Sequence, residues 1–322
     1  MNSSYRQMIP IFFAVDDNYA PFLGVALRSM LSNADPTCFY RIHILTEGLS
    51  NSNVERILAE QTENSRITFD DISEAVARIA ADIHVRDYYS AATYYRVFIG
   101  NIYTEYDRVL YLDSDIVFKG DVAKMYDTNI GDKLIGAVRE DVMAMEKVFG
   151  DYAEVVVGVP VEKYFNAGIL LIDLKKYREL GMEERFIELL RRRRFTVAQD
   201  QDYLNLLCLG MVHYFDSSWN HTSVKGALND GREPNIVHYK MDWKPWHYDG
   251  VLFEELFWEY ADATAFSEEL HAMKERYSIG EKMRDRAARE RLAATAYRET
   301  IAYLSDALVG GDALSKMCPL NA

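Results

Sequence analysis

The sequence predicts an α/β protein with a doubly wound, mostly parallel sheet and a helical C-terminal extension. Three observations support this prediction. Apolar runs of strand length alternate with amphipathic helical segments through the first 250 residues, a pattern typical of βαβ units. The first run, over 9–15, holds no polar side chain, as expected of a strand covered on both faces. Helix formers dominate beyond residue 250, so we assign one domain to 1–250 and an extension to 251–322.

The expected elements follow one another in regular order. After the first strand and a short turn, apolar side chains recur at helical spacing over 19–33. A second strand at 41–45 precedes a helix at 50–61 whose first residue, Ser50, is a good N-cap. The remaining strands are expected at 66–72, 109–112, 133–138 and 167–174, and the remaining helices at 88–103, 183–194, 200–210, 253–261, 267–277 and 284–304. The aromatic segment 236–250 is expected to form a loop.

Composition narrows the class of protein. The 322 residues carry a formal net charge of −14, which argues against nucleic-acid binding because that function needs a basic face. Cys38, Cys208 and Cys318 are too scattered for a disulfide framework or a zinc cluster. They indicate a reducing compartment, and the N-terminal apolar run at 9–15 is too short for a signal segment, so we expect a cytoplasmic protein. No apolar run approaches the roughly 18 residues of a membrane span, so we expect no transmembrane segment. The sequence has neither a G-x-G-x-x-G after the first strand nor a P-loop, which disfavours hydride transfer and P-loop chemistry.

Two carboxylates follow the strand that ends at Leu112. Asp113 and Asp115 stand one residue apart, so their side chains are expected to project to the same side. Ligands of open α/β sheets bind at the carboxyl ends of the strands, and paired carboxylates there suit a hard divalent cation, Mg²⁺ or Mn²⁺. The alternative is an acidic turn that leads into the next segment. The D-S-D motif alone does not separate these two interpretations.

A histidine and a lysine later in the chain extend the metal hypothesis. His238 follows a short apolar run and is expected at another strand end, where a neutral imidazole would complete an O/O/N site suited to Mn²⁺. Lys244 lies six residues on, within W-K-P-W, and a fixed ammonium there would neutralise a diphosphate. The alternative is a buried core histidine next to tryptophans that only pack.

Polar clusters elsewhere are candidates for binding a polyhydroxylated ligand. Asp16 and Asn18 follow the first strand, where a nucleoside would lie in this architecture or where they form an Asx turn. The acids of Q-D-Q-D at 199–202 either orient hydroxyl groups or cap the helix that follows. Asn166 precedes an Ala-Gly pair that lets a ligand approach the backbone. Arg96 either meets an acid in the core or reaches a diphosphate.

The four consecutive arginines at 191–194 also allow two interpretations. They follow the helical pattern of 183–190, so they form the favourable cationic end of that helix. The alternative is a contact with an anionic membrane surface.

Five segments together resemble glycosyltransferase family eight. They occur in the family's order over 9 to about 249 and read FFAVDDNYAPFLGVALRSM, YYRVFIGN with DRVLYLDSDIVFKGD, YFNAGILLIDLKKYR, AQDQDYLN and HYKMDWKPWH. That family includes bacterial lipopolysaccharide galactosyl- and glucosyltransferases and glycogenin. The resemblance implies a GT-A fold with a Rossmann-like nucleotide-binding sheet. It also implies a UDP-hexose donor, Mn²⁺ (or Mg²⁺) as cofactor and retention of anomeric configuration.

Position by position, the resemblance implies roles for residues of this chain. The implied metal ligands are Asp113, Asp115 and His238. The implied UDP-binding residues are Ala14, Asp16, Asn18 and Ser114, with Arg96 and Lys244 near the diphosphate. The implied donor-sugar pocket contains Asn166, Asp200 and Gln201, with Gln201 beneath the anomeric carbon, and an acid that is either Glu140 or Asp141. Relatives often have a glycine where this chain has Met241.

These residues lead us to expect a retaining hexosyltransferase that moves glucose or galactose from UDP to an acceptor hydroxyl on a glycan or a glycolipid such as lipopolysaccharide. The neutral amide of Gln201 is a poor nucleophile, which favours same-face attack over a covalent intermediate, with Asp200 orienting sugar hydroxyls. Two rivals are a sugar-nucleotide-binding protein without transfer activity and a sugar-1-phosphate nucleotidyltransferase. The segment 251–322 matches no motif, and we expect it to help dock an acceptor or a membrane surface.

Overall fold

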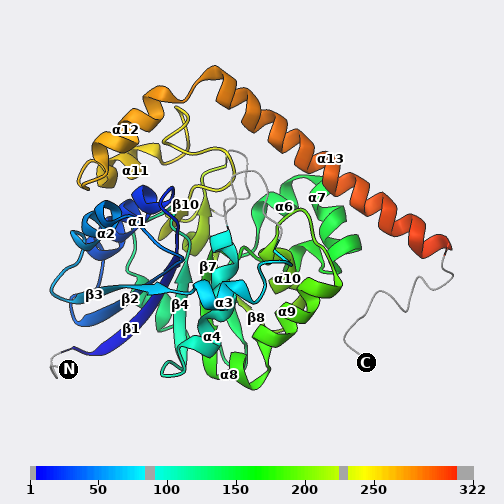
Figure 1. The fold of residues 1–322 in the computed structure, drawn as a ribbon, viewed down its shortest axis with the longest axis horizontal. Coiled ribbons are helices and arrows are strands. Elements are labelled where there is room, and N and C mark those ends of the chain that lie inside the picture. The colour runs from blue at the N-terminus through cyan, green and yellow to red at the C-terminus, as the bar shows by residue number, and fades with distance from the viewer. Residues whose placement is uncertain (1–4, 84–90, 225–230, 310–322) are drawn as a thin grey trace.

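The computed structural model describes residues 5–83, 91–224 and 231–309, and its centre is a seven-stranded sheet (Figure 1). The strand order is β3-β2-β1-β4-β7-β6-β8. The strands are β1 (Gln7–Ala14), β2 (Cys38–Thr46), β3 (Ser65–Asp71), β4 (Arg108–Leu112), β6 (Ile135–Ala137), β7 (Ile169–Asp173) and β8 (Val212–Tyr214). The predicted α/β architecture is therefore confirmed.

One strand of this sheet runs against the others. β7 is antiparallel to both β4 and β6, whereas the pairs β1–β2, β2–β3, β1–β4 and β6–β8 are parallel. The expectation of a mostly parallel sheet is thus confirmed. Because β7 is reversed, the residues that precede it lie at the edge where β4 and β6 end. Residues that follow β4 and β6 and residues that precede β7 therefore lie at the same edge of the sheet.

Apolar side chains on the two faces of the sheet enter two separate cores. In β1, Ile11 and Phe13 belong to one buried cluster and Phe12 to the other, as the alternation of side chains along a strand requires. All three side chains are fully buried. The continuous apolar run of the first strand is therefore explained by burial on both faces.

A second, three-stranded sheet changes one sequence-based expectation. It contains β5 (Ile116–Phe118), β9 (His221–Thr222) and β10 (Ile236–His238), with β10 antiparallel to β5 and parallel to β9. His238 was expected at a strand end, and β10 confirms this expectation; the interpretation of 236–250 as a loop is corrected only over its first three residues. A run of three residues is too short to show the alternating pattern of a strand in the sequence. In the structure β10 pairs His238 with Ile116, and this pairing places the imidazole beside Asp115.

The helices cover the sheet as the amphipathic segments predicted. Ser50 caps its helix by accepting the Asn53 N–H, as expected. The predicted helix at 88–103 begins outside the described residues, and its described part is a 3-10 turn, η1 (Ala91–Phe98), followed by α4 (Ile99–Ile102). The others that follow β1, β2, β3 and β5 are α1 (Ala20–Ser32), α2 (Asn51–Leu58), α3 (Ser73–Ala77) and α5 (Val122–Tyr126). Those between β6 and β7 are α6 (Asp141–Met145), α7 (Lys147–Tyr152), the π-helix η2 (Ala153–Val157) and η3 (Val161–Lys163). Those between β7 and β8 are α8 (Leu174–Glu179), α9 (Met182–Arg192) and α10 (Asp200–Leu207), and the short η4 (Ser217–Asn220) follows β8.

Three helices form the C-terminal extension: α11 (Glu254–Ala261), α12 (Ser267–Arg276) and α13 (Ile279–Val309). Figure 1 shows α13 running from α12 across the molecule to α6 and α7. It packs against α7 and η2, and its Leu292 and Ala296 are buried in the same core as Phe149. Within the described residues, no helix has the length and apolarity that crossing a membrane requires.

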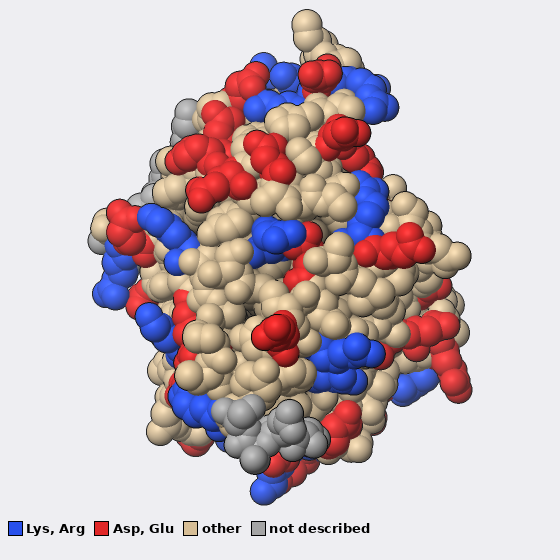
Figure 2. All heavy atoms as spheres, turned by 90° about the vertical axis from the view of Figure 1, so that its left-hand side faces the viewer, with Lys and Arg blue, Asp and Glu red and all other residues tan. Residues whose placement is uncertain are grey.

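The surface mixes both signs of charge. Figure 2 views the side on which β3 and α12 lie, and its described surface shows acidic and basic side chains interspersed, without a continuous basic area. Such a surface gives a polyanion no extended basic face to bind.

Candidate active site

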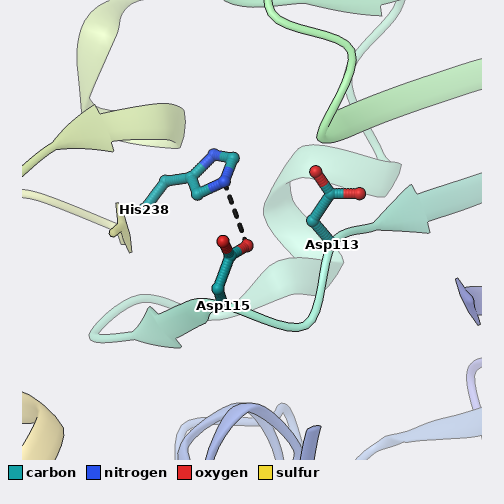
Figure 3. A group of neighbouring side chains, drawn as sticks. All are labelled: Asp113, Asp115 and His238. Carbon is teal, nitrogen blue, oxygen red and sulfur yellow. Dashed lines mark ion pairs between the residues drawn. The ribbon is translucent and has the colours of Figure 1, made fainter. Parts of the chain in front are cut away.

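Two carboxylates and an imidazole meet at the carboxyl edge of the main sheet (Figure 3). Asp113 follows β4, Asp115 precedes β5, and His238 ends β10. One ligand atom from each side chain lies within 4.8 Å of the other two. The Asp113 N–H donates to the Gly168 carbonyl at 2.7 Å, which fixes the turn to the chain entering β7. The structure therefore brings the three predicted ligands together.

A buried chain of amides determines how the His238 ring is oriented. The Gly168 N–H can only donate, and it donates to Asn166 Oδ1 at 2.9 Å. Asn220 Nδ2 donates to the same oxygen at 2.8 Å, so Asn220 Oδ1 faces His238 Nδ1 at 3.0 Å. An amide oxygen only accepts, so the Nδ1 position of His238 carries a proton. Nε2 is left to face Asp115.

This orientation fits a bound cation. His238 Nε2 lies 3.1 Å from Asp115 Oδ1, and both atoms are acceptors when the ring is neutral. A proton or a metal cation between them is needed to make the contact favourable. Adjacent ligand atoms of an octahedral cation bound at about 2.1 Å stand about 3 Å apart, in agreement with this separation. Two carboxylates and an imidazole are also a suitable donor set for Mg²⁺ or Mn²⁺.

Gly168 leaves room for the ligands. A Cβ atom at this position would lie 2.4 Å from Asp113 Oδ2 and 2.7 Å from His238 Cε1. Both distances are far below van der Waals contact, so any larger residue would displace two of the three ligands. The Ala-Gly pair after Asn166 was expected to let a ligand approach the backbone. In the structure the missing side chain makes space for the carboxylate and the imidazole.

Lys244 lies against the same cluster. Its buried ammonium is 2.5 Å from Asp115 Oδ2, donates to the Tyr239 carbonyl and lies 5.6 Å from the ring centre of Trp246. Burial alone would raise the pKa of Asp115, but Lys244 and then His238 outweigh it and hold that pKa below its ordinary value. Asp115 is therefore ionised and able to bind a cation at neutral pH.

Arg96 connects two predicted site residues. Its guanidinium lies 3.2 Å from Asp113 Oδ1 and 3.0 Å from Asp200 Oδ2, and it also donates to the Ala167 carbonyl. Of the two alternatives for Arg96, the structure thus shows the one in which it meets acids in the interior. Burial raises the pKa of Asp200 to about 7, while Arg96 opposes the rise and Asp113 adds to it.

A second polar group lies next to the metal ligands. Asn166 Nδ2 donates to Glu140 Oε2 at 2.5 Å, and the buried Lys240 ammonium lies 3.3 Å from Glu140 Oε1. Burial would raise the pKa of Glu140, but Lys240 and then Asn166 outweigh it and hold that pKa below its ordinary value. The Gln201 side-chain oxygen accepts the Ala167 N–H at 2.9 Å, which fixes its amide at the edge of this group.

One cavity joins these groups. Its walls include every site residue predicted from the sequence except two, Asn18 and Asp141. Asn18 is exposed, and the Asp16 carboxylate accepts the N–H groups of Asn18 and Tyr19, so the Asx turn is present. Of the two acids at 140–141, the structure places Glu140 on the wall. The predicted wall residues are Ala14, Asp16, Arg96, Asp113, Ser114, Asp115, Glu140, Asn166, Asp200, Gln201, His238 and Lys244.

The acids of Q-D-Q-D do not cap α10. Its N-cap is Gln199, whose φ of 50° is unusual for a residue with a side chain and whose side chain makes no capping bond. Asp202 instead binds the Tyr152 and Tyr164 hydroxyls, at 3.0 and 2.5 Å, and so supports the wall from behind. The capping alternative is therefore wrong, because both acids are turned toward buried partners.

The arginine run at 191–194 ends α9, as predicted. Arg191 pairs with Asp82 at 3.1 Å, Arg192 pairs with Glu188 at 2.6 Å, and Arg193 donates to the Val156 carbonyl at 2.6 Å. Three of these cations thus have partners within the chain. A membrane contact at this run remains only a sequence-based alternative.

The sequence-based reasoning missed Asn220 and Lys240. Asn220 lies in a short 3-10 turn whose sequence carries no motif, so nothing local marks it. Lys240 had a signal, because it stands two residues after His238 at a strand end and such residues project to the same side. A search for polar residues at that spacing would have found it.

Fold and site together define a class of protein. A doubly wound sheet with one reversed strand, a two-acid turn after its fourth strand and an imidazole from a small second sheet are the features of a GT-A glycosyltransferase. Comparison with known proteins agrees with this assignment. The model of the family "Glycosyl transferase family 8" matches residues 10–250, and the chain belongs to that family.

Individual relatives agree with the family. The lipopolysaccharide 1,2-glucosyltransferase of Escherichia coli K12 is 26% identical over 261 residues, which are 76% of this chain and 75% of that protein. The galactosyltransferase LgtC, solved with donor and acceptor sugar analogues, has a TM-score of 0.66 and 29% identity over 80% of this chain and 96% of its own. The bifunctional glycosyltransferase WbbM has a TM-score of 0.73 and 25% identity over 85% of this chain. This chain spans about half, 53%, of the WbbM chain.

Proposed function

We propose that this glycosyltransferase moves a hexose, glucose or galactose, from a UDP-sugar to an acceptor hydroxyl with retention of configuration and dependence on Mn²⁺. The acceptor is a glycan or a glycolipid such as lipopolysaccharide. The names of two similar proteins, a lipopolysaccharide 1,2-glucosyltransferase and a galactosyltransferase, support both the hexose and the acceptor class. We place the reaction in the cytoplasm, with a peripheral contact to the membrane that carries the acceptor.

One observation supports this function above all others. Asp113, Asp115 and His238 face one another within 4.8 Å, and the Lys244 ammonium lies on Asp115 in the same cavity. A cation site beside a fixed ammonium is the arrangement that a departing diphosphate needs, because its charge must be neutralised as the glycosidic bond breaks. The negative charge on the diphosphate increases when UDP departs, so these two positive charges stabilise the leaving group more than the bound donor.

The three ligands would hold the cation, and a bound Mn²⁺ would supply the positive charge that a leaving diphosphate requires. Asn220 holds His238 with Nε2 toward that position through its 3.0 Å bond to Nδ1. Lys244 adds a second positive charge, beside the other carboxylate oxygen of Asp115. No strong general acid is then needed to release UDP.

Gln201 supports same-face attack. Its amide oxygen is neutral and already accepts the Ala167 N–H, so it is a weak nucleophile. The second lone pair of this oxygen can still stabilise positive charge on the sugar ring. We therefore assign Gln201 to stabilisation of the oxocarbenium-like transition state, with the acceptor attacking on the face from which UDP leaves.

The remaining predicted residues bind the donor in this proposal. Asn166, Glu140 and Asp200 present fixed amide and carboxyl groups to sugar hydroxyls. Ala14, Asp16 and Ser114 line the part of the cavity after β1 and β4, where uracil and ribose would bind. Asn18 and Asp141 do not line the cavity, so we assign them no contact with the donor.

Incubating the protein with UDP-glucose or UDP-galactose and Mn²⁺ tests the proposal. We expect slow release of UDP with water as acceptor, and its loss in Lys244→Ala and Asp115→Asn variants. Nuclear magnetic resonance of the released hexose, recorded at once, reports the configuration. Binding without UDP release would point to a sugar-nucleotide-binding protein, and pyrophosphate release from UTP and a sugar-1-phosphate would point to a nucleotidyltransferase.

A further inference from the structure

Lys244 lies in a segment that is attached to the C-terminal extension on both of its flanks. The segment runs from Tyr239 to Tyr248 and follows the metal ligand His238. The Lys244 N–H donates to the Asp242 carbonyl at 2.9 Å, and the Lys244 carbonyl accepts the N–H of Tyr248 at 2.9 Å. The backbone of Lys244 is therefore bonded directly to Asp242 and Tyr248, both of which contact α13.

On the first flank, Arg289 of α13 donates to the Asp242 carboxylate. The Asp242 side chain is 12% exposed and the Arg289 side chain 38%. The preceding residue, Met241, has a φ of +59°, a left-handed conformation that costs about 1–2 kcal/mol in a residue with a Cβ. Such a conformation persists only where the surrounding contacts hold it, and the Asp242–Arg289 pair lies one residue away.

On the second flank, Asp285 of α13 accepts hydrogen bonds from two tyrosines. Its Oδ2 accepts the Tyr248 hydroxyl at 2.7 Å and the Tyr277 hydroxyl at 2.5 Å. The His247 ring stacks on Tyr277 with a centroid distance of 3.7 Å and an interplanar angle of 5°. The turn that contains the Lys244 carbonyl is thus joined to α13 by the Asp285 carboxylate, and an aromatic stack joins it to Tyr277, which lies between α12 and α13.

The position of α13 itself is fixed by the core of the main domain. One turn after Arg289, Leu292 is 7% exposed, and Ala296 is fully buried. Leu292 also lines the active-site cavity. Helix α13 is anchored in the core by Leu292 and Ala296, and it contacts the segment through Asp285 and Arg289. A substitution at either contact residue is therefore expected to alter the position of Lys244.

We propose that α13 positions Lys244 for the diphosphate, and that Arg289 and Asp285 are positioning residues of the active site. Because it assigns Lys244 to the diphosphate, this inference rests on the proposed function. The catalytic domain alone would then leave the segment 239–248 without the contacts that hold Met241 in its left-handed conformation. The C-terminal extension is accordingly part of the donor site.

Hydrogen exchange and UDP titration on the full chain test this inference. The variants are Arg289→Gln, Arg289→Lys and Lys244→Ala, with Arg286→Gln as the matched control. Arg286 is an arginine on the same helix, 84% exposed and paired only with Glu290 among the described contacts. We expect Arg289→Gln to speed amide exchange over 239–248 and to weaken UDP binding in the presence of Mn²⁺ by roughly 5- to 150-fold, the usual range of coupling between sites.

The controls separate positioning from simple stabilisation of the fold. Arg289→Lys keeps the ion pair and is expected to recover most of the UDP affinity, and Arg286→Gln to behave as wild type. A general loss of stability would instead lower the unfolding temperature and speed exchange in β1 and β2 as well. Unchanged exchange over 239–248 in Arg289→Gln would overturn the inference whether or not UDP binds. If Lys244→Ala leaves UDP affinity unchanged, the proposed function fails, and the exchange result still decides the role of α13.

Discussion

His238 is oriented by residues that do not touch the cation site. Asn220 accepts its Nδ1 proton and in turn donates to Asn166, so the ring depends on a chain of buried amides. Partners of this kind fix the tautomer of a metal-binding histidine. Neither the spacing of the motifs nor the composition reveals Asn220, because the contact joins residues 18 positions apart through tertiary packing alone.

Replacing Asn220 by alanine should weaken metal binding without removing a ligand. The His238 ring would lose the acceptor that keeps Nε2 facing Asp115, and we expect Mn²⁺ affinity to fall about 10- to 100-fold. Titration calorimetry with Mn²⁺ measures this. Asn101→Ala removes an exposed asparagine that contacts Glu183 and Glu184 and does not line the cavity, and it should bind as wild type does. Equal affinities for all three proteins would contradict the orienting role of Asn220.

Met241 provides a test of backbone strain. Its φ of +59° is accessible to glycine without cost, whereas alanine retains the clash of Cβ with the following carbonyl. Both Met241→Gly and Met241→Ala lose the same packing beyond Cβ, so comparing them isolates the strain. We expect the glycine variant to be more stable than the alanine variant by about 1 kcal/mol in denaturant unfolding. The reverse order would show that the segment relaxes out of the left-handed conformation.

At the scale of elements, the order of strands and helices was predictable, but the direction of β7 was not. Strands buried on both faces read as continuous apolar runs in either direction, so Ile169–Asp173 carried no sign of its reversal. The pairing of β10 with β5 could not be predicted either, because a strand of three residues is too short to show an alternating pattern in the sequence. Asp113 and Asp115 were found because charges directly after an apolar run stand out. Lys240 was missed because it lies two residues beyond the strand, in an irregular segment where its spacing from His238 was not considered.

The reversal of β7 makes Gly168 critical. The chain enters β7 directly behind the metal ligands, and a Cβ at Gly168 would lie 2.4 Å from Asp113 Oδ2. Gly168→Ala should therefore push Asp113 and His238 apart and lower Mn²⁺ affinity by at least about tenfold, a typical cost for disturbing the surroundings of a metal site. Titration with Mn²⁺ measures the loss. Gly280→Ala is the control, because the nearest atom to its Cβ would be 3.7 Å away, and this variant should bind normally.

At the scale of the whole molecule, the extension and the site meet in one interface. The sequence suggested separate roles for 1–250 and 251–322, and that division stays a prediction. The contacts of Asp285 and Arg289 could not be foreseen, because they join α13 to a segment about 40 residues earlier without any motif. Helix α13 was recognisable as a helix, but the side that packs against the site was not.

The pH dependence of stability should report on this interface through His247. Burial lowers the pKa of His247 to about 4 from its ordinary 6.5; Asp285 and Glu281 oppose the shift, and Lys244 and Lys282 add to it. The fold therefore favours the neutral ring that stacks on Tyr277. Its contribution is complete above pH 6.5 and is lost as the pH falls from 6.5 toward 4.

Replacing His247 by phenylalanine isolates this contribution, because the phenyl ring can still stack and does not titrate. Wild type should lose about 1–2 kcal/mol more unfolding free energy than His247→Phe between about pH 7.5 and pH 5, a value reduced for the exposed part of the ring. Urea unfolding at both pH values measures the difference. The other titrating groups are shared by the two proteins and cancel in the comparison. Parallel pH profiles would show that the folded protein takes up the His247 proton as readily as the unfolded chain does, and the stack on Tyr277 would then not depend on charge.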